Sequence, residues 1–92
     1  SSNNVIEFLQ SEGYIRFKAD SEASSKALYE AYKLWCEDNV RKPMSANRLS
    51  SELAQNERLY NVEATNNIYA GGKRVRGFVG IEVLAKSSFL KW

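Results

Sequence analysis

The sequence predicts one small α+β domain, with helices in the first two thirds of the chain and a β-hairpin in the last third. Apolar residues recur at helical spacing in the first part, and they alternate about a Gly71-Gly72 pair in the second. A chain of 92 residues with 43% hydrophobic residues can build one hydrophobic core but is too short for two. We therefore interpret residues 1–92 as a single domain.

The first elements are short. Asn3 and Asn4 are good N-cap residues for a first helix of about two turns, which ends before Gly13. Residues 14–18 then alternate apolar and basic side chains, as in an extended segment. We interpret residues 14–18 as a candidate extra strand that could join the hairpin.

The most strongly periodic segment is the predicted second helix. Three serines, Ser21, Ser24 and Ser25, are candidate N-caps, and Asn39 is a suitable end. Pro43 prevents this helix from continuing into the next segment. The apolar residues that recur at helical spacing are Ala27, Leu28, Ala31, Tyr32 and Trp35. We assign Tyr32 and Trp35 to the core.

A third helix is predicted over residues 45–57, with Ser45 as its N-cap. Ala46, Leu49 and Leu53 form its apolar stripe, and Glu52 lies at the rim of the opposite face. That face is typical of a solvated helix surface, but its side chains are also of the types that contact base edges and phosphates. Its residues are Asn47, Arg48, Ser51 and Gln55, with Arg58 just beyond.

A two-residue turn at Gly71-Gly72 sets the predicted hairpin register. On one side of the pleat it pairs Ile68 with Val75, Ala64 with Val79, Val62 with Ile81, and Tyr60 with Val83. On the other side it pairs Tyr69 with Arg74, Asn67 with Arg76, and Thr65 with Phe78. All pairs on the first side are apolar, whereas a turn at Asn66-Asn67 loses this match.

Three helices followed by a hairpin is the order of a winged helix-turn-helix domain. In that architecture the third helix (45–57) enters the DNA major groove, and the hairpin tip (70–76) is the wing that contacts the phosphate backbone. We therefore predict binding to double-stranded DNA through Asn47, Arg48, Ser51, Gln55, Arg58, Asn67, Tyr69, Lys73, Arg74 and Arg76.

The distribution of charge supports this hypothesis more than the net charge of +2 does. Residues 1–46 carry six basic and seven acidic residues, whereas residues 47–92 carry seven basic and four acidic residues. From Ala64 onward, Glu82 is the only acidic residue and the basic residues are Lys73, Arg74, Arg76, Lys86 and Lys91. One face of the domain is therefore expected to be cationic.

Composition excludes several other functions. Cys36 is the only cysteine and histidine is absent, so an internal disulfide, a zinc finger and a histidine-based catalytic pair are excluded. The 92 residues contain no phosphate-binding loop and no apolar run of membrane-spanning length, and we expect no leader segment. We expect no enzyme activity, cofactor, metal, membrane or small-molecule substrate. A lone cysteine, interpreted as a small buried hydrophobe, fits a reducing cytoplasmic compartment.

Several motifs together resemble a known family. They are Leu28-Tyr29, Tyr32 and Trp35-Cys36, then Ser45, Leu49 and Leu53, and finally Arg74, Arg76 and Gly80-Ile81. This pattern resembles the carboxy-terminal domain of the poxvirus-type primase-helicases of phages, plasmids and mobile islands. Leu49-Ser50 departs from it, since the pattern has an aromatic residue followed by Gly at these positions.

The resemblance implies a winged-helix DNA-binding module appended to a replicative helicase ATPase, with the catalytic parts elsewhere in the parent polypeptide. Its expected partners are double-stranded DNA and that ATPase, inside a bacterial or virus-infected cell. The absence of an initiator Met fits a domain excised from a longer chain. Two alternatives stay open: a winged helix that docks on a protein partner or neighbouring subunit, which the modest net charge favours, and an unrelated winged-helix regulator.

Overall fold

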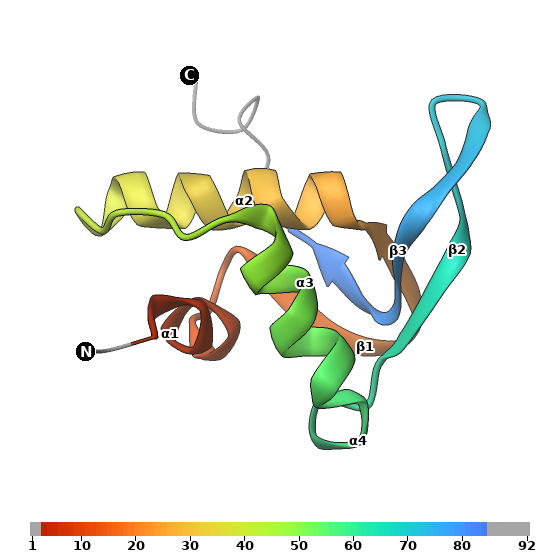
Figure 1. Cartoon of the computed structure of the whole chain (residues 1–92), viewed down its shortest axis with the longest axis horizontal. Coiled ribbons are helices and arrows are strands. Elements are labelled where there is room, and N and C mark those ends of the chain that lie inside the picture. Colours follow the sequence, from red (N-terminus) through yellow and green to blue (C-terminus); the bar gives the residue numbers. More distant parts are fainter. Residues whose placement is uncertain (1–2, 85–92) are drawn as a thin grey trace.

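Helices form most of the first 60 residues and a three-stranded antiparallel sheet completes the fold, so the α+β class is confirmed. The computed structural model describes residues 3–84, and the predicted cationic contributions of Lys86 and Lys91 lie outside them. In chain order the elements are α1 (Asn4–Gln10), β1 (Ile15–Ser24), α2 (Ser25–Asp38), α3 (Ala46–Gln55), α4 (Glu57–Tyr60), β2 (Glu63–Ala70) and β3 (Lys73–Val83). Figure 1 shows their arrangement.

The predicted starts of the three longer helices are confirmed. Asn3 caps α1, Ser24 caps α2 and Ser45 caps α3, and each cap side chain accepts a hydrogen bond from a backbone N–H in the first turn. Asn39 ends α2, as expected. These ends were predictable because a helix cap depends on side chains within three or four residues of the terminus.

The third helix is shorter than predicted. It ends at Gln55 rather than at residue 57, because Asn56 leaves the helical conformation and donates its side-chain N–H to the backbone oxygen of Glu52 at 2.8 Å. A separate short helix, α4, follows, so residues 3–84 contain four helices rather than the three predicted. Asn61, in the left-handed conformation at φ 57°, then turns the chain into β2.

The candidate strand at residues 14–18 is part of a longer one. β1 runs from Ile15 to Ser24 and pairs with β3, with a register shift between Phe17 and Glu22. The candidate cap Ser21 therefore lies within the strand, and its hydroxyl donates to the backbone oxygen of Lys18 at 2.5 Å. The strand order is β1-β3-β2, so β3 is central.

The hairpin register is confirmed near the turn and wrong farther from it. Ile68 pairs with Val75 and Tyr69 with Arg74 across the Gly71-Gly72 turn, as predicted. A bulge between Thr65 and Ile68 then shifts the pairing by one residue, so that Ala64 lies opposite Phe78 and Thr65 opposite Gly77. The shift, together with the start of β2 at Glu63, removes the predicted pairs Ala64–Val79, Thr65–Phe78, Asn67–Arg76, Val62–Ile81 and Tyr60–Val83.

β3 passes closely between its neighbours at Gly77. This residue lies opposite Ser24 of β1 and Thr65 of β2. A Cβ atom added to Gly77 would lie 2.2 Å from the backbone oxygen of Ala23 and 2.7 Å from Cγ1 of Ile68. Glycine is therefore required where the hairpin crosses the end of β1.

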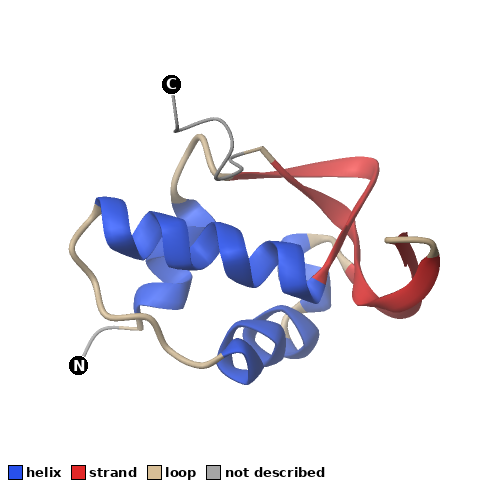
Figure 2. Cartoon of the chain, turned by 90° about the horizontal axis from the view of Figure 1, so that it is seen from above, coloured by secondary structure: helices blue, strands red, loops and turns tan. Residues whose placement is uncertain are grey.

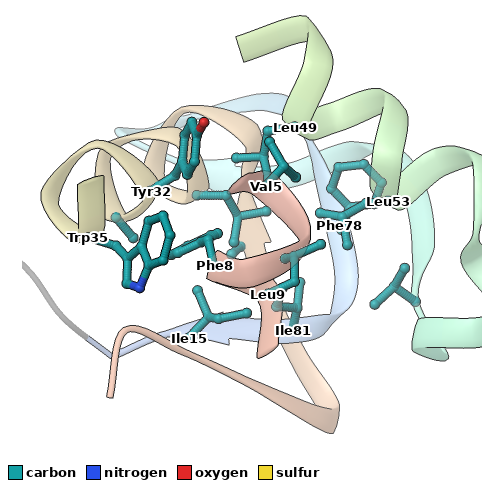
Figure 3. Close-up of a cluster of buried hydrophobic side chains, with 14 of the residues drawn as sticks. Val5, Phe8, Leu9, Ile15, Tyr32, Trp35, Leu49, Leu53, Phe78 and Ile81 are labelled. Atoms are coloured by element: carbon teal, nitrogen blue, oxygen red, sulfur yellow. The ribbon is translucent and has the colours of Figure 1, made fainter. Parts of the chain in front are cut away.

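The core lies between the helices and the sheet, and the two occupy different sides of the molecule in Figure 2. The ring of Phe8 on α1 lies 5.4 Å from that of Tyr32 and 6.0 Å from that of Trp35, both on α2 (Figure 3). Leu49 and Leu53 bring α3 onto the same cluster. The assignment of Tyr32 and Trp35 to the core is confirmed, and Cys36 is buried beside them.

The hydroxyl of Tyr32 joins three parts of the chain. It donates to the side-chain oxygen of Asn4 at the start of α1 and accepts from the backbone N–H of Met44 at 2.7 Å. The hydroxyl of Tyr29 donates to the backbone oxygen of Met44 at 2.9 Å. These bonds fix the connector that leads into α3, and with it the direction in which α3 starts.

Candidate nucleic-acid interface

All ten residues predicted to contact DNA are exposed. On α3 this follows from the burial of Leu49 and Leu53, which turns the opposite side of the helix to the solvent. On the hairpin it follows from geometry, because the tip extends beyond the body of the domain (Figure 1). We call residues 68–76, the part of the hairpin beyond Gly77, the arm.

α3 and the base of the hairpin border a shared open hollow of about 320 Å³. Asn47 and Ser51 line it from α3, Thr65 and Asn66 line it from β2, and Arg76 lines it from β3. The fold thus brings three predicted DNA-binding residues, Asn47, Ser51 and Arg76, to one site. Amides, hydroxyls and a guanidinium together can donate to phosphate oxygens and base edges.

A second depression continues along α3. It is lined by Arg48, Ser51, Glu52 and Gln55, together with Asn3. Ser51 borders both depressions, so the predicted polar face of α3 is continuous with the hollow beside the hairpin. Four of the five residues predicted from helical spacing therefore share one surface.

Glu52 is the one carboxylate among the residues that line these two depressions, and its hydrogen bonds are made toward α4. It accepts hydrogen bonds from the side-chain N–H of Asn56 and the hydroxyl of Tyr60, each at 3.2 Å. Burial, followed by the interaction with Glu52, raises the pKa of Tyr60, so this hydroxyl keeps its proton and donates.

Arg58 does not line the hollows that the predicted residues of α3 line. It belongs to α4 and lines a different hollow, together with Asp20 and Glu57. Extending the periodicity of α3 past Asn56 placed Arg58 beside Gln55, but the helix ends before it. The structure therefore does not bring Arg58 to the surface that α3 and the hairpin share.

The cations of the arm form no ion pair within residues 3–84. Among residues 3–84 the two ion pairs join Arg16 to Glu82 and Arg41 to Glu7, and neither involves a cation of the arm. Lys73, Arg74 and Arg76 are all exposed near the turn, with Asn67 just before the arm. Exposed cations on a narrow projection can approach a polyanion from either side.

Lys26 joins these cations, although nothing in the sequence pattern indicates it. This residue in the first turn of α2 lines a hollow together with Lys73 and Arg76 of the hairpin. The reason is tertiary: β1 ends opposite Gly77, and α2 begins at once beside the base of the arm. A single exposed lysine on a helix carries no local signal of such a neighbour.

The residues that carry the family resemblance lie partly in the core and partly on the surface. Leu28, Tyr32 and Trp35 are in the core, and Gly80 adopts φ +99° beside the backbone of Asn61. Where the family pattern has an aromatic residue and Gly, Leu49 is buried against the core and Ser50 lines the hollow beside the hairpin. The departure thus keeps an apolar residue inside and adds a hydroxyl outside.

In residues 3–84 no cluster of His, Cys, Asp and Glu side chains could hold a metal ion. Within the same part of the chain, no helix is long and apolar enough to cross a membrane.

Fold and surface define a small α+β domain with a polar helix face and a cationic hairpin arm on adjoining surfaces. The chain matches the family model described as Poxvirus D5 protein-like over residues 1–89, and it belongs to this family. The resemblance inferred from the motifs is therefore confirmed over nearly the whole chain, and the family supports a replication-related protein. Searches of curated proteins and of solved structures gave no match.

Proposed function

We propose that this domain binds double-stranded DNA as a winged helix within a poxvirus D5-like replication protein. In this proposal the exposed face of α3 enters the major groove, and the arm is the wing that lies on the phosphate backbone. The observation that carries the proposal is the meeting of Asn47 and Ser51 of α3 with Arg76 of β3 at one hollow.

The chemistry of α3 supports contacts with bases. Asn47, Arg48 and Gln55 carry side chains that can form paired hydrogen bonds with base edges, and Ser51 can donate or accept. Because α3 is fixed by Leu49, Leu53 and the N-cap at Ser45, its exposed face is presented on a rigid element.

The arm supports affinity without sequence information. Lys73, Arg74 and Arg76 can each neutralise a phosphate and release a counterion, and Asn67 and Tyr69 can contact the backbone beside them. Lys26 adds a cation next to Lys73 and Arg76. In this proposal the affinity for DNA depends on the local cluster of cations on the arm and at Lys26. The modest net charge of the whole domain matters less.

The remaining roles belong to the parent protein. In this proposal the ATPase of the parent polypeptide is the partner that moves along DNA, the domain itself is not catalytic, and the protein works inside the cell. The domain would anchor the motor to duplex DNA.

A salt titration of duplex binding tests the proposal. Fluorescence anisotropy is measured at several salt concentrations for the wild type, Arg74→Ala and Arg76→Ala. Each arm variant should weaken binding to all duplexes alike and lower the salt slope by about 0.9 for the lost phosphate contact. Arg58→Ala is the matched control, because it removes the same charge from α4, away from the shared surface. An unchanged slope in both arm variants contradicts the role of the arm.

The role of α3 has its own test. Arg48→Ala and Asn47→Ala are compared with the wild type on duplexes selected from a random pool. Loss of a base contact should cost about 1–3 kcal/mol on selected duplexes and less on unselected ones. Equal losses on both would make these residues backbone contacts.

A second candidate function is docking on a protein partner, which the surface around α4 favours. Leu59 is 74% exposed there, Phe17 stacks on Tyr60 at 5.4 Å, and Glu57 lies in the adjoining hollow. An apolar and acidic surface suits a protein better than DNA. If roughly 50 μM domain fails to retain random duplex at low salt, docking replaces DNA binding as the main proposal. Leu59→Lys should then abolish association with the ATPase part of the parent protein.

A further inference from the structure

Tyr69 is the exposed aromatic residue of the arm. Its side chain is 68% exposed, and it is absent from the core cluster and from the half-buried residues packed against that cluster. It pairs across the strands with Arg74, whose guanidinium carbon lies 5.9 Å from the centre of the tyrosine ring. The ring is therefore held by a cation and open to solvent.

The neighbouring pair shows that the arm does not need Tyr69 for anchorage. Ile68 is 3% exposed and pairs with Val75, and these two residues face the opposite side of the pleat from Tyr69 and Arg74. The one buried side chain of the arm, Ile68, thus lies on one face. The other face combines an aromatic ring with a guanidinium group.

This combination matches the chemistry of an unpaired base better than that of a duplex. In a duplex, proteins contact base edges in the grooves, because both faces of each base are covered by its neighbours. An unpaired base exposes its faces, and aromatic rings and guanidinium groups stack on them. The cations of the arm suit phosphates, whereas the open face of the Tyr69 ring suits the face of a base.

We propose that Tyr69 and Arg74 form a stacking platform for an unpaired nucleobase, so that the domain binds a duplex end with a single-stranded tail more tightly than a blunt duplex. This inference rests on the proposed DNA binding and adds the form of DNA that the domain prefers.

Further cations lie along one edge of β3 in the arm. Beyond Gly77 one edge of β3 has no paired strand, since β1 ends at Ser24. Lys26, Lys73 and Arg76 line the hollow along this edge. Phosphates of an unpaired strand that reached this edge would meet cations of both α2 and the arm.

The test compares three kinds of DNA by anisotropy at one salt concentration: a blunt duplex, the same duplex with a single-stranded tail on one or the other strand, and the tail alone. The first unpaired base is 2-aminopurine, whose fluorescence falls when it stacks. The wild type should bind the tailed duplex at least about fivefold more tightly than the blunt duplex, the lower end of the effect of one stacked base. Fluorescence of the probe should fall on binding.

The variants separate stacking from charge. Tyr69→Ala should abolish both the gain from the tail and the quenching, so that it binds the tailed and the blunt duplex with equal affinity. Tyr69→Phe keeps the ring and should keep both effects. Lys33→Ala removes an exposed cation of α2 as a control and should change neither. Equal unfolding midpoints would show that Tyr69→Ala is folded, as expected for an exposed side chain.

Three results would overturn the inference. The wild type could show no gain from the tail, or Tyr69→Ala could keep the gain and the quenching; in both cases blunt-duplex binding would leave the proposed function standing. If no DNA bound at all, the proposed function would fail together with the inference.

Discussion

The body of the domain and its arm are built on opposite principles. In the body, Phe8, Tyr32 and Trp35 are buried in contact with one another, and a tyrosine hydroxyl joins three segments. In the arm, Tyr69 and the three cations are exposed, and few contacts hold them. Stability and proposed DNA contact therefore depend on different residues. Changes in one region should leave the other largely intact, and the following predictions test that separation.

The largest effect is expected where the two regions meet. Gly77→Ala places a Cβ atom against the backbone oxygen of Ala23, so β1 or the hairpin must shift. We expect the free energy of unfolding to fall by about 3 kcal/mol, measured by urea denaturation. Gly71→Asn is the control, because the turn is open and Asn tolerates its φ of 60°. Wild-type stability of Gly77→Ala would show that the body and the arm are not tightly joined there.

The next effect lies within the body. Tyr32→Phe keeps the ring but removes the hydroxyl that bonds Asn4 and the N–H of Met44. The unfolding free energy should fall by about 1–2 kcal/mol, since buried polar groups lose their partner. The same change at the exposed Tyr69 should have almost no effect on stability. Equal losses at both positions would contradict the separation.

A gain of stability is expected at the end of α2. Val40 is 91% exposed and has φ 52°, a left-handed conformation that a β-branched residue adopts at a cost. Val40→Asn should raise the unfolding free energy by about 1 kcal/mol, because Asn tolerates this conformation. Val40→Ala keeps the Cβ atom and should therefore raise the unfolding free energy by less than Val40→Asn does. No difference between these two variants would argue against backbone strain at this position.

An alkaline pH scan should also report on the body. Tyr14 donates to Asp38 at 2.5 Å, and this bond, with burial, raises the pKa of Tyr14 to about 12 from 10.0. The unfolded chain loses this proton at a lower pH than the folded chain, so the stabilisation is full below pH 10 and is lost toward pH 12. Tyr14→Phe should make the decline shallower, as followed by unfolding midpoints. Tyr32 and Tyr60 also have raised pKa values, so some decline should remain.

The smallest effect on stability is expected in the arm. Replacing both Arg74 and Arg76 by Ala should change the unfolding free energy by less than about 0.5 kcal/mol, because both residues are exposed and lie outside the ion pairs of residues 3–84. The same double variant should lose most of its salt-dependent binding to duplex DNA. A large loss of stability would mean that the arm helps to hold the body together.

Features set by neighbouring residues could be predicted from the sequence. The caps at Asn3, Ser24 and Ser45 and the turn at Gly71-Gly72 each depend on a few adjacent side chains. The apolar stripes predicted most of the buried positions of α2 and α3 for the same reason, although Ala46, at the start of the α3 stripe, is exposed. Exposure of the polar face of α3 followed directly from its stripe.

Features that leave no mark on the apolar pattern, or that distant contacts set, could not be predicted in this way. The break at Asn56 interrupts no apolar stripe, since Leu53 is the last buried residue of α3. The bulge at residues 66–67 adds one extra residue to β2 between paired positions. The alternation of apolar and polar residues along the sequence does not reveal such an insertion. Lys26 meets the arm only because β1 crosses the sheet and ends beside Gly77.

The central position of β3 also determines when the domain can fold during synthesis. β1 and β2 each pair with β3, and β3 follows both of them in the chain. Neither strand has its main hydrogen-bonding partner until residues 73–83 have left the ribosome. The helices therefore cannot pack on a complete sheet before β3 has been synthesised. Formation of the native domain is therefore a late, cooperative event governed by contacts between distant residues such as Ile15 and Val83.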